Sequence, residues 1–470
     1  MQLLVRVIVS AAFSAVAILT SAGQPAYAQD ACTHYASPAG GGSGTSASSP
    51  FKISSFWPVA KPGHTLCLID GEYTGSGSMI NPPRYLNGTS SARITVRALN
   101  DGKVRINGQG SYYPVRLSYV NYFTIEGINA SNSAGTVVGI SHSNNNIIRR
   151  VAAWDAADGN HTIFGIHYGS YNLLEDVAGW GVARKIYESS YGGNYTTIRR
   201  AWGRWEGSHV VGPKMTYTFA YNNYNMLIEN ALGTWSGERM KQTYTLLDYY
   251  GKPWTGNGAG TYTNYSVDQP YAIFGIDRAD GAKDINTKLL GSIAYVRVTD
   301  RFHAPQLVFA TKLDSIKIGD TVAYVQPGSY TNKRRFALYN LQTATGTNLA
   351  AQNLTGIGGA ASYYGSEWKK SLISEGLSLS SVGNVFSSTS AARLCYRYKN
   401  GTLTTEPLWP WPMNQRIIEA TVKSGRTAVD VTATIQSMLG TIPDACKSNG
   451  GTGPSVATAP SAPINLQVTP

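Results

Sequence analysis

Four tryptophans recur along the middle of the chain, each a few residues after a short apolar run. Trp154, Trp180, Trp205 and Trp235 close the segments NNIIRRVAAW, YNLLEDVAGW, NYTTIRRAWGRW and NMLIENALGTW, with spacings of 26, 25 and 30 residues. Strand-like residues repeating at such an interval are typical of a solenoid in which each coil stacks on the next. Residues at one offset from each tryptophan are therefore expected to form a column in the folded protein.

Other short runs of strand-forming residues extend the pattern on both sides of these tryptophans. ARITVRAL and YFTIEGINA precede them, and LLGSIAYVRV, DSIKIGDTVAYV and RRFALYNLQ follow. Each run is rich in β-branched or aromatic residues and is bounded by Gly, Asn or Ser, as strands are. One such strand cannot bury a face alone, so we predict an all-β solenoid whose coils supply one another's core. Residues 240–285 interrupt the repeat and are expected to form an extended loop or an irregular coil.

A series of small motifs precedes the first coil, within residues 31–75. They are Ser37-Pro38, Gly44-Thr45-Ser46, Pro50-Phe51, Lys61-Pro62-Gly63 and Asp70-Gly71-Glu72-Tyr73-Thr74. This series resembles the N-terminal segment of right-handed parallel β-helix proteins, a pectate lyase-like group of secreted, polysaccharide-active proteins. The resemblance implies an all-β, right-handed parallel β-helix with a short N-terminal capping helix. His64 stands where that group usually has Asp. Lyases, hydrolases and epimerases share the pattern, so it leaves the reaction open.

The two ends of the chain differ from the repeat. Residues 1–28 have the features of a secretory signal peptide: Arg6, the apolar run VIVSAAFSAVAIL and the small-x-small site Ala26-Tyr27-Ala28. We therefore expect a protein secreted to the periplasm or the cell exterior, without membrane insertion. Residues 29–448 are assigned to the parallel β-helix domain. Residues 449–470 combine a Gly/Pro/Ser linker with APINLQVTP, which resembles the first strand of a fibronectin type III module.

The chain is basic but sparsely charged. Its formal net charge is +12, although only 14% of its residues are charged. A basic exported protein suits an acidic polysaccharide as its partner. The Lys and Arg residues do not occur in long runs, which argues against nucleic acid as a partner, and we expect a monomer. Most of the cations, including Arg149-Arg150 and Arg199-Arg200, are expected to be solvated or salt-bridged at the surface.

Four cysteines lie in two pairs near the ends of the expected solenoid. An even number of cysteines in an exported protein favours disulfides, and three connectivities are possible. We prefer the local pairing of Cys32 with Cys67 and of Cys395 with Cys446. Each bridge would then hold one end of the solenoid, where fraying costs least.

The column that follows the tryptophans carries the chemistry. The residues four positions after each tryptophan are Asp158, Arg184, His209 and Arg239. Such a mixture suits β-elimination of a uronate, in which a cation neutralises the carboxylate and thereby acidifies the C5 proton, and a base removes that proton. Burial or neighbouring cations can lower the pKa of a lysine enough for it to act as the base.

These considerations assign a role to each candidate of a polysaccharide lyase site. Lys214 is the favoured base, Arg184 and Arg239 neutralise the carboxylate, and His209 or Tyr217 donates the proton to the leaving group. The side chains expected to bind the substrate are Lys185, Tyr187, Trp205, Glu206, Trp235 and Lys241.

Acidic residues in the same segments support a different interpretation. Asp155, Asp158 and Glu206 would lie on adjacent coils, roughly 4.8 Å apart. Carboxylates at such distances could form a glycoside hydrolase pair, or Asp155 and Asp158 could hold Ca²⁺. A non-catalytic polysaccharide-binding protein or adhesin is a third alternative. The Asp-rich motifs of polygalacturonases and the DPHD motif of mannuronan epimerases are absent from the sequence, which favours the lyase.

Overall fold

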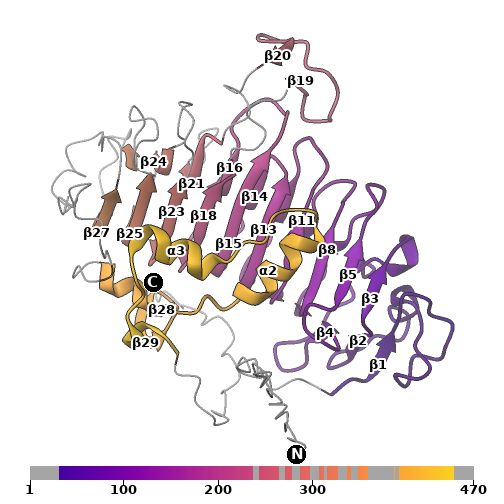
Figure 1. Ribbon diagram of the computed structural model, residues 1–470. Helices are drawn as coiled ribbons and strands as arrows, with labels where there is room; N and C mark the ends of the chain where they lie inside the picture. Colours follow the sequence, from indigo (N-terminus) through magenta and orange to yellow (C-terminus); the bar gives the residue numbers. More distant parts are fainter. Residues whose placement is uncertain are drawn as a thin grey trace, which may run out of the picture.

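The protein is built from β-strands that stack coil upon coil in parallel (Figure 1). The computed structural model describes residues 31–236, 243–263, 270–277, 286–296, 306–311, 315–325, 336–339, 348–357, 386 and 391–448. The expected signal peptide, the 449–470 tail, Arg239 and Lys241 lie outside these residues. Within the described coils, each strand pairs in parallel with its counterpart in the next coil, for example His34–Ala36 with Thr65–Leu68. The predicted all-β parallel β-helix is therefore confirmed.

Each coil contributes strands to two sheets. The smaller sheet, called sheet B, has eight strands: β6 (Val115–Ser118), β9 (Val138–Ser141), β12 (Thr162–His167), β14 (Lys185–Ser190), β16 (Met215–Ala220), β21 (Ala272–Asp277), β24 (Gln306–Thr311) and β26 (Phe336–Tyr339). The larger, sheet A, has seventeen: β1 (His34–Ala36), β2 (Thr65–Leu68), β3 (Gly71–Tyr73), β4 (Ile94–Ala98), β5 (Val104–Asn107), β7 (Phe123–Glu126), β8 (Ile128–Ser131), β10 (Ile147–Arg149), β11 (Ala152–Trp154), β13 (Leu173–Val182), β15 (Thr197–Gly207), β17 (Leu227–Glu229), β18 (Leu232–Trp235), β22 (Thr287–Leu290), β23 (Ile293–Val296), β25 (Ser315–Val325) and β27 (Asn348–Ile357).

A sharp bend divides sheet A into two arms within each coil. The residue at the bend has a left-handed backbone, with φ of 50° at Arg150, 52° at Asp176 and 49° at Arg200. Such a conformation is unfavourable for side chains other than Gly, Asn and Asp. Arg200 Nε donates to Asp176 Oδ1 at 2.6 Å, so an ion pair between adjacent coils helps to hold the bend.

The tryptophan repeat forms two columns, where the sequence predicted one. Trp154 is paired with Trp180, and both belong to an apolar cluster on the outside of sheet A. Trp205 is in register with Gly181, one residue past Trp180, and is paired with Trp235. Successive side chains of a strand point to opposite faces, so this shift of one residue turns Trp205 and Trp235 into the coil interior.

Residues 240–285, where the repeat breaks, contain an excursion from the coil. Its described part includes an antiparallel pair, β19 (Thr243–Thr245) with β20 (Thr261–Thr263), and the chain then returns to sheet B as β21. The excursion projects beyond the edge of the sheets in Figure 1. β21 lies within residues 240–285, so part of the segment predicted to be a loop or an irregular coil is a regular sheet B strand.

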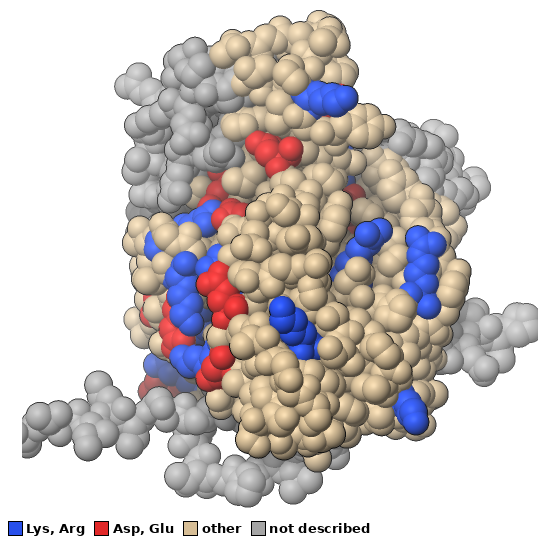
Figure 2. Space-filling view, turned by 90° about the vertical axis from the view of Figure 1, so that its right-hand side faces the viewer, with Lys and Arg blue, Asp and Glu red and all other residues tan. Residues whose placement is uncertain are grey.

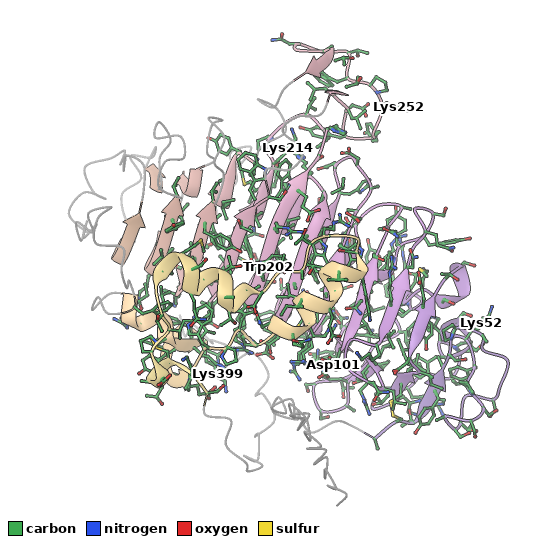
Figure 3. All side chains as sticks on the ribbon, in the orientation of Figure 1. Lys52, Asp101, Trp202, Lys214, Lys252 and Lys399 are labelled. Atoms are coloured by element: carbon green, nitrogen blue, oxygen red, sulfur yellow. A yellow bond between two sulfur atoms is a disulfide. The ribbon has the colours of Figure 1, made fainter. Side chains whose placement is uncertain are left out.

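The C-terminal segment leaves the coil and packs along the outside of sheet A. It comprises β28 (Tyr396–Lys399), β29 (Thr402–Pro407), α2 (Asn414–Lys423) and α3 (Val431–Leu439), and the helices lie in front of the strands in Figure 1. Ile417 and Ile435 share one buried apolar cluster with Trp154, Trp180 and Trp202, and Trp202 lies behind this segment in Figure 3. The outward tryptophans are therefore covered by the chain itself.

The charged residues outside the core mostly lie close to charges of the opposite sign. In a view onto the end that carries β1, basic and acidic side chains adjoin one another along one edge, and most of the remaining surface is uncharged (Figure 2). Arg416 Nη1 contacts Asp101 Oδ1 at 2.6 Å, which ties α2 to an N-terminal coil. None of the helices in the described part of the chain is long and apolar enough to cross a membrane.

The N-terminal end carries two short turns of 3-10 helix, where the resemblance implied a capping helix. They span Ile53–Ser55 and Ser76–Ser78. Pro50 and Pro58 flank the first turn, and proline disfavours the helical conformation in the residue before it, so the segment has room for little more than one turn. The predicted capping α-helix is not found among the described residues of this region.

Both predicted disulfides are confirmed. Cys32 is bonded to Cys67 and Cys395 to Cys446, and the described residues include no free cysteine. The first bridge joins Cys32, two residues before β1, to Cys67 in β2. The second closes the C-terminal segment, so it secures the cover of sheet A and not the last coil.

We expect that replacing Cys32 and Cys67 by alanine lowers thermal stability more than activity. The bridge closes a loop with a sequence separation of 35 residues. A loop of that size corresponds to about 4 kcal/mol in the chain-entropy model. Differential scanning calorimetry of the double variant measures the effect. An unchanged melting temperature would contradict a stabilising bridge at this end.

Candidate functional site

Three members of the predicted column come together where sheet A strands end and sheet B strands begin. His209 Nδ1 lies 2.8 Å from Asp158 Oδ2. The His209 backbone N–H and the Ser208 hydroxyl both donate to Asp158 Oδ1, each at 3.0 Å. Asp158 and His209 come from turns two coils apart, so stacking of the coils creates the pair.

The Asp158 carboxylate defines which nitrogen of His209 can exchange a proton. Burial alone would raise the pKa of Asp158, but the hydrogen bonds from His209 and Ser208 outweigh it and lower that pKa below its ordinary value. An ionised Asp158 accepts the Nδ1–H proton, which leaves Nε2 as the acid–base atom of the imidazole. The His209 side chain retains 18% of its full exposure, although its Nε2 atom is itself buried.

Arg184 supplies a fixed positive charge beside this pair. Its Nη1 donates to Asn160 Oδ1 at 2.6 Å, and its Nε donates to the Pro213 carbonyl at 3.0 Å. Its guanidinium also lies over the Tyr249 ring, 4.8 Å from the centroid. All these partners are neutral, and no carboxylate within the described residues neutralises Arg184. Arg184 is 6% exposed, so this unneutralised charge lies just below the surface.

Lys185, Glu188 and His167 form a second charged group on the outer face of sheet B. Lys185 Nζ lies 2.5 Å from Glu188 Oε1, and His167 Nε2 lies 3.4 Å from Glu188 Oε2. Burial lowers the pKa of Lys185, an effect that Glu188 opposes and Arg184 reinforces. The strands on either side place Gly165 and Thr218 next to Glu188, so the sheet surface around it is made of small residues.

The predicted base, Lys214, lies at the edge of the same region. It directly precedes β16, as Arg184 directly precedes β14, and Pro213 next to it is the carbonyl partner of Arg184. In Figure 3 it lies beneath the excursion that carries Lys252. Lys214 has 4% of its surface exposed, less than the His209 side chain.

Four predicted site residues lie inside the coil and cannot meet a substrate. Tyr187, Tyr217 and Trp205 are fully buried, and Trp235 is 4% exposed. The Tyr187 hydroxyl donates to the Trp202 carbonyl at 2.9 Å, and the Tyr217 hydroxyl donates to the Ala201 carbonyl at 2.8 Å. The predicted roles of Tyr217 as proton donor and of the other three as substrate-binding residues are wrong, because these side chains form the core.

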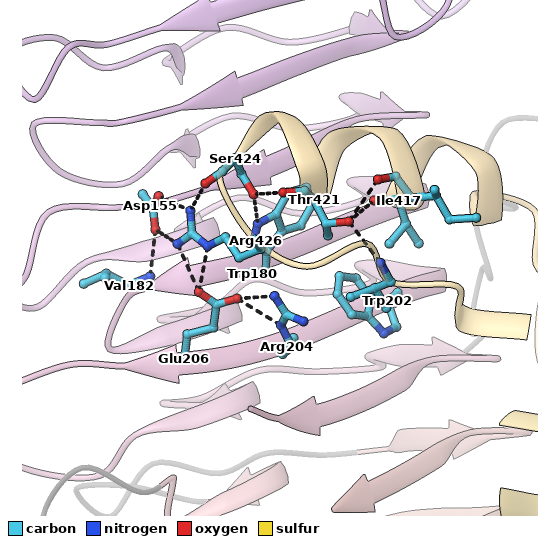
Figure 4. Close-up of polar contacts among 12 residues, drawn as sticks. Asp155, Trp180, Val182, Trp202, Arg204, Glu206, Ile417, Thr421, Ser424 and Arg426 are labelled. Atoms are coloured by element: carbon cyan, nitrogen blue, oxygen red, sulfur yellow. Dashed lines mark hydrogen bonds and ion pairs between the residues drawn. The ribbon is translucent and has the colours of Figure 1, made fainter. Parts of the chain in front are cut away.

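Asp155 and Glu206 belong to an ion-pair network on the outside of sheet A (Figure 4). Arg426, which follows α2, contacts Asp155 Oδ1 at 2.6 Å and Glu206 Oε2 at 3.0 Å. Arg204 Nη2 lies 2.5 Å from Glu206 Oε1. Glu206 therefore anchors the C-terminal segment, in contrast to the predicted substrate-binding role.

The residues predicted to hold Ca²⁺ do not fit a shared site. Asp155 is engaged by Arg426, whereas Asp158 is engaged by His209 and Ser208. No group of three or more His, Cys, Asp or Glu side chains placed to hold a metal ion occurs in the described part of the chain. None of the steps proposed below uses a metal.

Several residues of the region had no signal in the sequence. Asn160 and Tyr249 contact Arg184, and neither stands at a repeated offset from a tryptophan. Tyr249 comes from the excursion, whose path depends on tertiary packing. Glu188 could have been found, because it follows Lys185 by three residues within one strand run.

Comparisons with solved structures find similarities at low sequence identity. No family model matches the chain, and no curated protein matches it. A solved pectate lyase, Pel9A, is 15% identical with a TM-score of 0.45, covering 71% of this chain and 77% of the lyase. A rhamnogalacturonan lyase is 12% identical with a TM-score of 0.45, covering 70% and 84%. An endo-xylogalacturonan hydrolase from Aspergillus tubingensis is 12% identical with a TM-score of 0.33, covering 70% and 100%. Likenesses of this size carry no argument about the reaction.

Proposed function

We propose that the protein is a secreted polysaccharide lyase that cleaves an acidic, uronate-containing polysaccharide by β-elimination at the Asp158–His209–Arg184 region. The observation that carries the proposal is an aspartate-held histidine beside an arginine whose charge no carboxylate neutralises among the residues that the structure describes. The two parts are joined through one turn, because Asp158 holds His209 and Asn160, two residues on, holds Arg184. Two disulfides in a chain with an N-terminal signal-like segment support export.

The proposed reaction uses these groups in sequence. Arg184 pairs with the uronate carboxylate and stabilises the negative charge that develops when C5 is deprotonated. His209 Nε2 accepts the C5 proton, and Asp158 stabilises the resulting imidazolium. The electron pair of the C5–H bond forms the C4–C5 double bond, the C4–O bond breaks, and the leaving oxygen takes up the proton that His209 Nε2 has accepted, which returns the imidazole to its neutral form. His209 replaces Lys214 as the favoured base because Asp158 engages its Nδ1, which leaves Nε2 to accept a proton.

Turnover of acidic polysaccharides tests the proposed function. The purified protein is incubated with polygalacturonate, alginate and hyaluronan, and unsaturated uronate is followed by ultraviolet absorbance while reducing ends are counted. A lyase produces both signals in step on at least one polymer. Reducing ends without unsaturation would identify a hydrolase, and binding without either product would identify an adhesin. Parallel assays of His209→Gln and Lys214→Ala show which residue is the base, since only loss of the true base abolishes the double bond.

We expect Arg184→Gln to lower kcat/KM on the cleaved polymer by about tenfold to a hundredfold, the loss of one charge-stabilising contact at the reacting centre. Glutamine keeps a donor for Asn160 but removes the charge that binds the carboxylate. Lys399→Gln, on the C-terminal hairpin at a distance from the region in Figure 3, is the control for a lost surface charge. Steady-state kinetics of both variants measure the effect. Equal kcat/KM for Arg184→Gln and the control would remove Arg184 from the mechanism.

A further inference from the structure

A row of aromatic rings runs along the edge where the sheet B strands end. One ring comes from each of six successive coils, and neighbouring ring centroids are 4.5–5.9 Å apart. We call this row the aromatic ladder; its members are Tyr85, Tyr119, His142, Tyr168, Tyr191 and Tyr221. Three of them are well exposed, Tyr85 at 71%, Tyr168 at 52% and Tyr191 at 43%.

The backbone under the ladder does not require aromatic residues. Every member has a left-handed backbone, with φ between 50° and 68°, which bulky side chains adopt at a cost comparable to the return from one stacked pair. Three or four residues further on, five of the same turns carry a second left-handed residue, and asparagine fills two of these positions: Tyr122, Asn145, Tyr171, Tyr195 and Asn225. Asparagine satisfies this conformation at less cost, so the turn itself does not require a ring.

The ladder presents the parts of its rings that attract anions. Tyr119, His142 and Tyr168 are stacked with interplanar angles of 11° and 21°, so their faces cover one another and their edges face outward. An aromatic edge carries positive partial charge. Arg84 lies over the Tyr119 ring at 4.7 Å, and Arg116 is exposed on the adjoining strand β6. Within the described residues neither arginine has an acidic partner, so this end of the ladder favours an acidic ligand.

The ladder and the candidate site lie at opposite ends of the same strands. Tyr168 directly follows β12 and Tyr191 directly follows β14, whereas Arg184 directly precedes β14. His167, on the sheet B face between them, meets Tyr191 edge to face with centroids 6.1 Å apart. A glycan that crosses the six residues of β14 can therefore contact both edges. The ladder continues towards the N-terminus past β9 and β6, beyond the coils that carry Asp158 and His209.

We infer that the aromatic ladder is a binding rim for a long acidic glycan, which follows the ladder at one edge of sheet B and crosses the sheet face to reach the candidate site at the other edge. This inference rests on the proposed function for its substrate class. It makes the protein dependent on polymer length, because short oligosaccharides at the candidate site cannot extend to the N-terminal rungs.

The test compares two pairs of tyrosines in the same turns. The ladder variant is Tyr168→Asn with Tyr191→Asn, and the control is Tyr171→Asn with Tyr195→Asn, a pair stacked at 4.7 Å at the second left-handed position of these turns. Asparagine tolerates the left-handed backbone at all four positions. Retardation is measured in native gels cast with polygalacturonate, alginate or hyaluronan, after circular dichroism has verified the fold. Arg84→Gln serves as an independent second variant.

The expected result is that the ladder variant binds the retarding polymer about tenfold more weakly while the control binds as the wild type does. On a cleaved polymer, kcat/KM falls in the ladder variant but stays unchanged on trisaccharides. Equal retardation of ladder variant, control and wild type overturns the inference, as does the absence of retardation of the wild type in all three gels. Retardation requires no turnover, so the two proposals can fail separately. If the ladder variant binds more weakly but no product forms, the proposed lyase function is refuted and the ladder inference stands. If product forms but the ladder variant binds as the wild type does, the ladder inference is refuted and the lyase function stands.

Discussion

Replacing Glu175 by glutamine is expected to destabilise the protein by about 3–5 kcal/mol, the usual cost of removing one partner from a buried ion pair. Three arginines converge on this carboxylate: Arg149 Nε at 3.0 Å, Arg199 Nε at 2.7 Å and Arg200 Nη2 at 2.7 Å. All four side chains are buried at the outer surface of sheet A, next to the bend. Without the carboxylate, three guanidinium groups remain close together with too little negative charge, and their mutual repulsion adds to the cost.

Chemical denaturation of the variant and the wild type measures this loss. Glu419→Gln is the control, because Glu419 forms an exposed pair with Lys103 at 3.3 Å. An exposed pair contributes at most about 1 kcal/mol. Equal stability of Glu175→Gln and the control would show that the buried network does not hold the coils together.

The same carboxylate predicts how wild-type stability depends on pH. Burial would raise the pKa of Glu175, but Arg200, Arg199 and Arg149 outweigh it and lower that pKa to about 2. A carboxyl group whose pKa is lower in the folded state stabilises the fold above its unfolded pKa, and this contribution is lost as the pH falls towards the folded pKa. The wild type should therefore lose stability between about pH 4.5 and pH 2, and Glu175→Gln should show a flatter profile there. Parallel profiles would contradict the assignment.

Replacing His209 by glutamine is expected to lower kcat by about 10²–10⁴-fold, the contribution of a general acid–base group. Asp158→Asn should cause a smaller loss in kcat with little change in KM, because asparagine leaves the imidazole in place but cannot stabilise its charged form. Asp70→Asn, an exposed aspartate on an N-terminal coil, is the matched control. A His209→Gln enzyme with wild-type kcat would remove the histidine from the reaction and direct attention to Lys214.

The repeat in the sequence predicted the solenoid and the neighbourhood of the site, but it could not predict which way each side chain points. Asp158, Arg184 and His209 stand four residues after their tryptophans and do lie on neighbouring coils. Trp205 follows Trp180 by 25 residues, one fewer than the 26 between Trp154 and Trp180. In the structure it is in register with Gly181 and not with Trp180. A shift of one residue reverses the face of a strand, so the periodicity could not distinguish a core tryptophan from an outer one.

Contacts between distant parts of the chain account for most of the remaining differences. Asp155 and Glu206 resembled a hydrolase pair because nothing local in the sequence reveals Arg426, which reaches Glu206 from 220 residues away. Arg149 and Arg199 were expected to be salt-bridged at the surface; they are salt-bridged, but buried, because Glu175 lies between them in the stack of coils. Tyr217 resembled a proton donor and is a core residue, since its hydroxyl finds backbone carbonyls inside the coil.

The proposed mechanism requires that the glycosidic bond breaks by elimination, and isotope incorporation tests that most directly. The wild-type protein is incubated with its cleaved polysaccharide in water enriched in oxygen-18, and the new chain ends are analysed by mass spectrometry. Elimination uses no water, so the account predicts unlabelled reducing ends and, in equal number, unsaturated ends that lack the mass of one water. Ends that have gained the labelled oxygen during cleavage, without any unsaturated uronate, would show hydrolysis and contradict it.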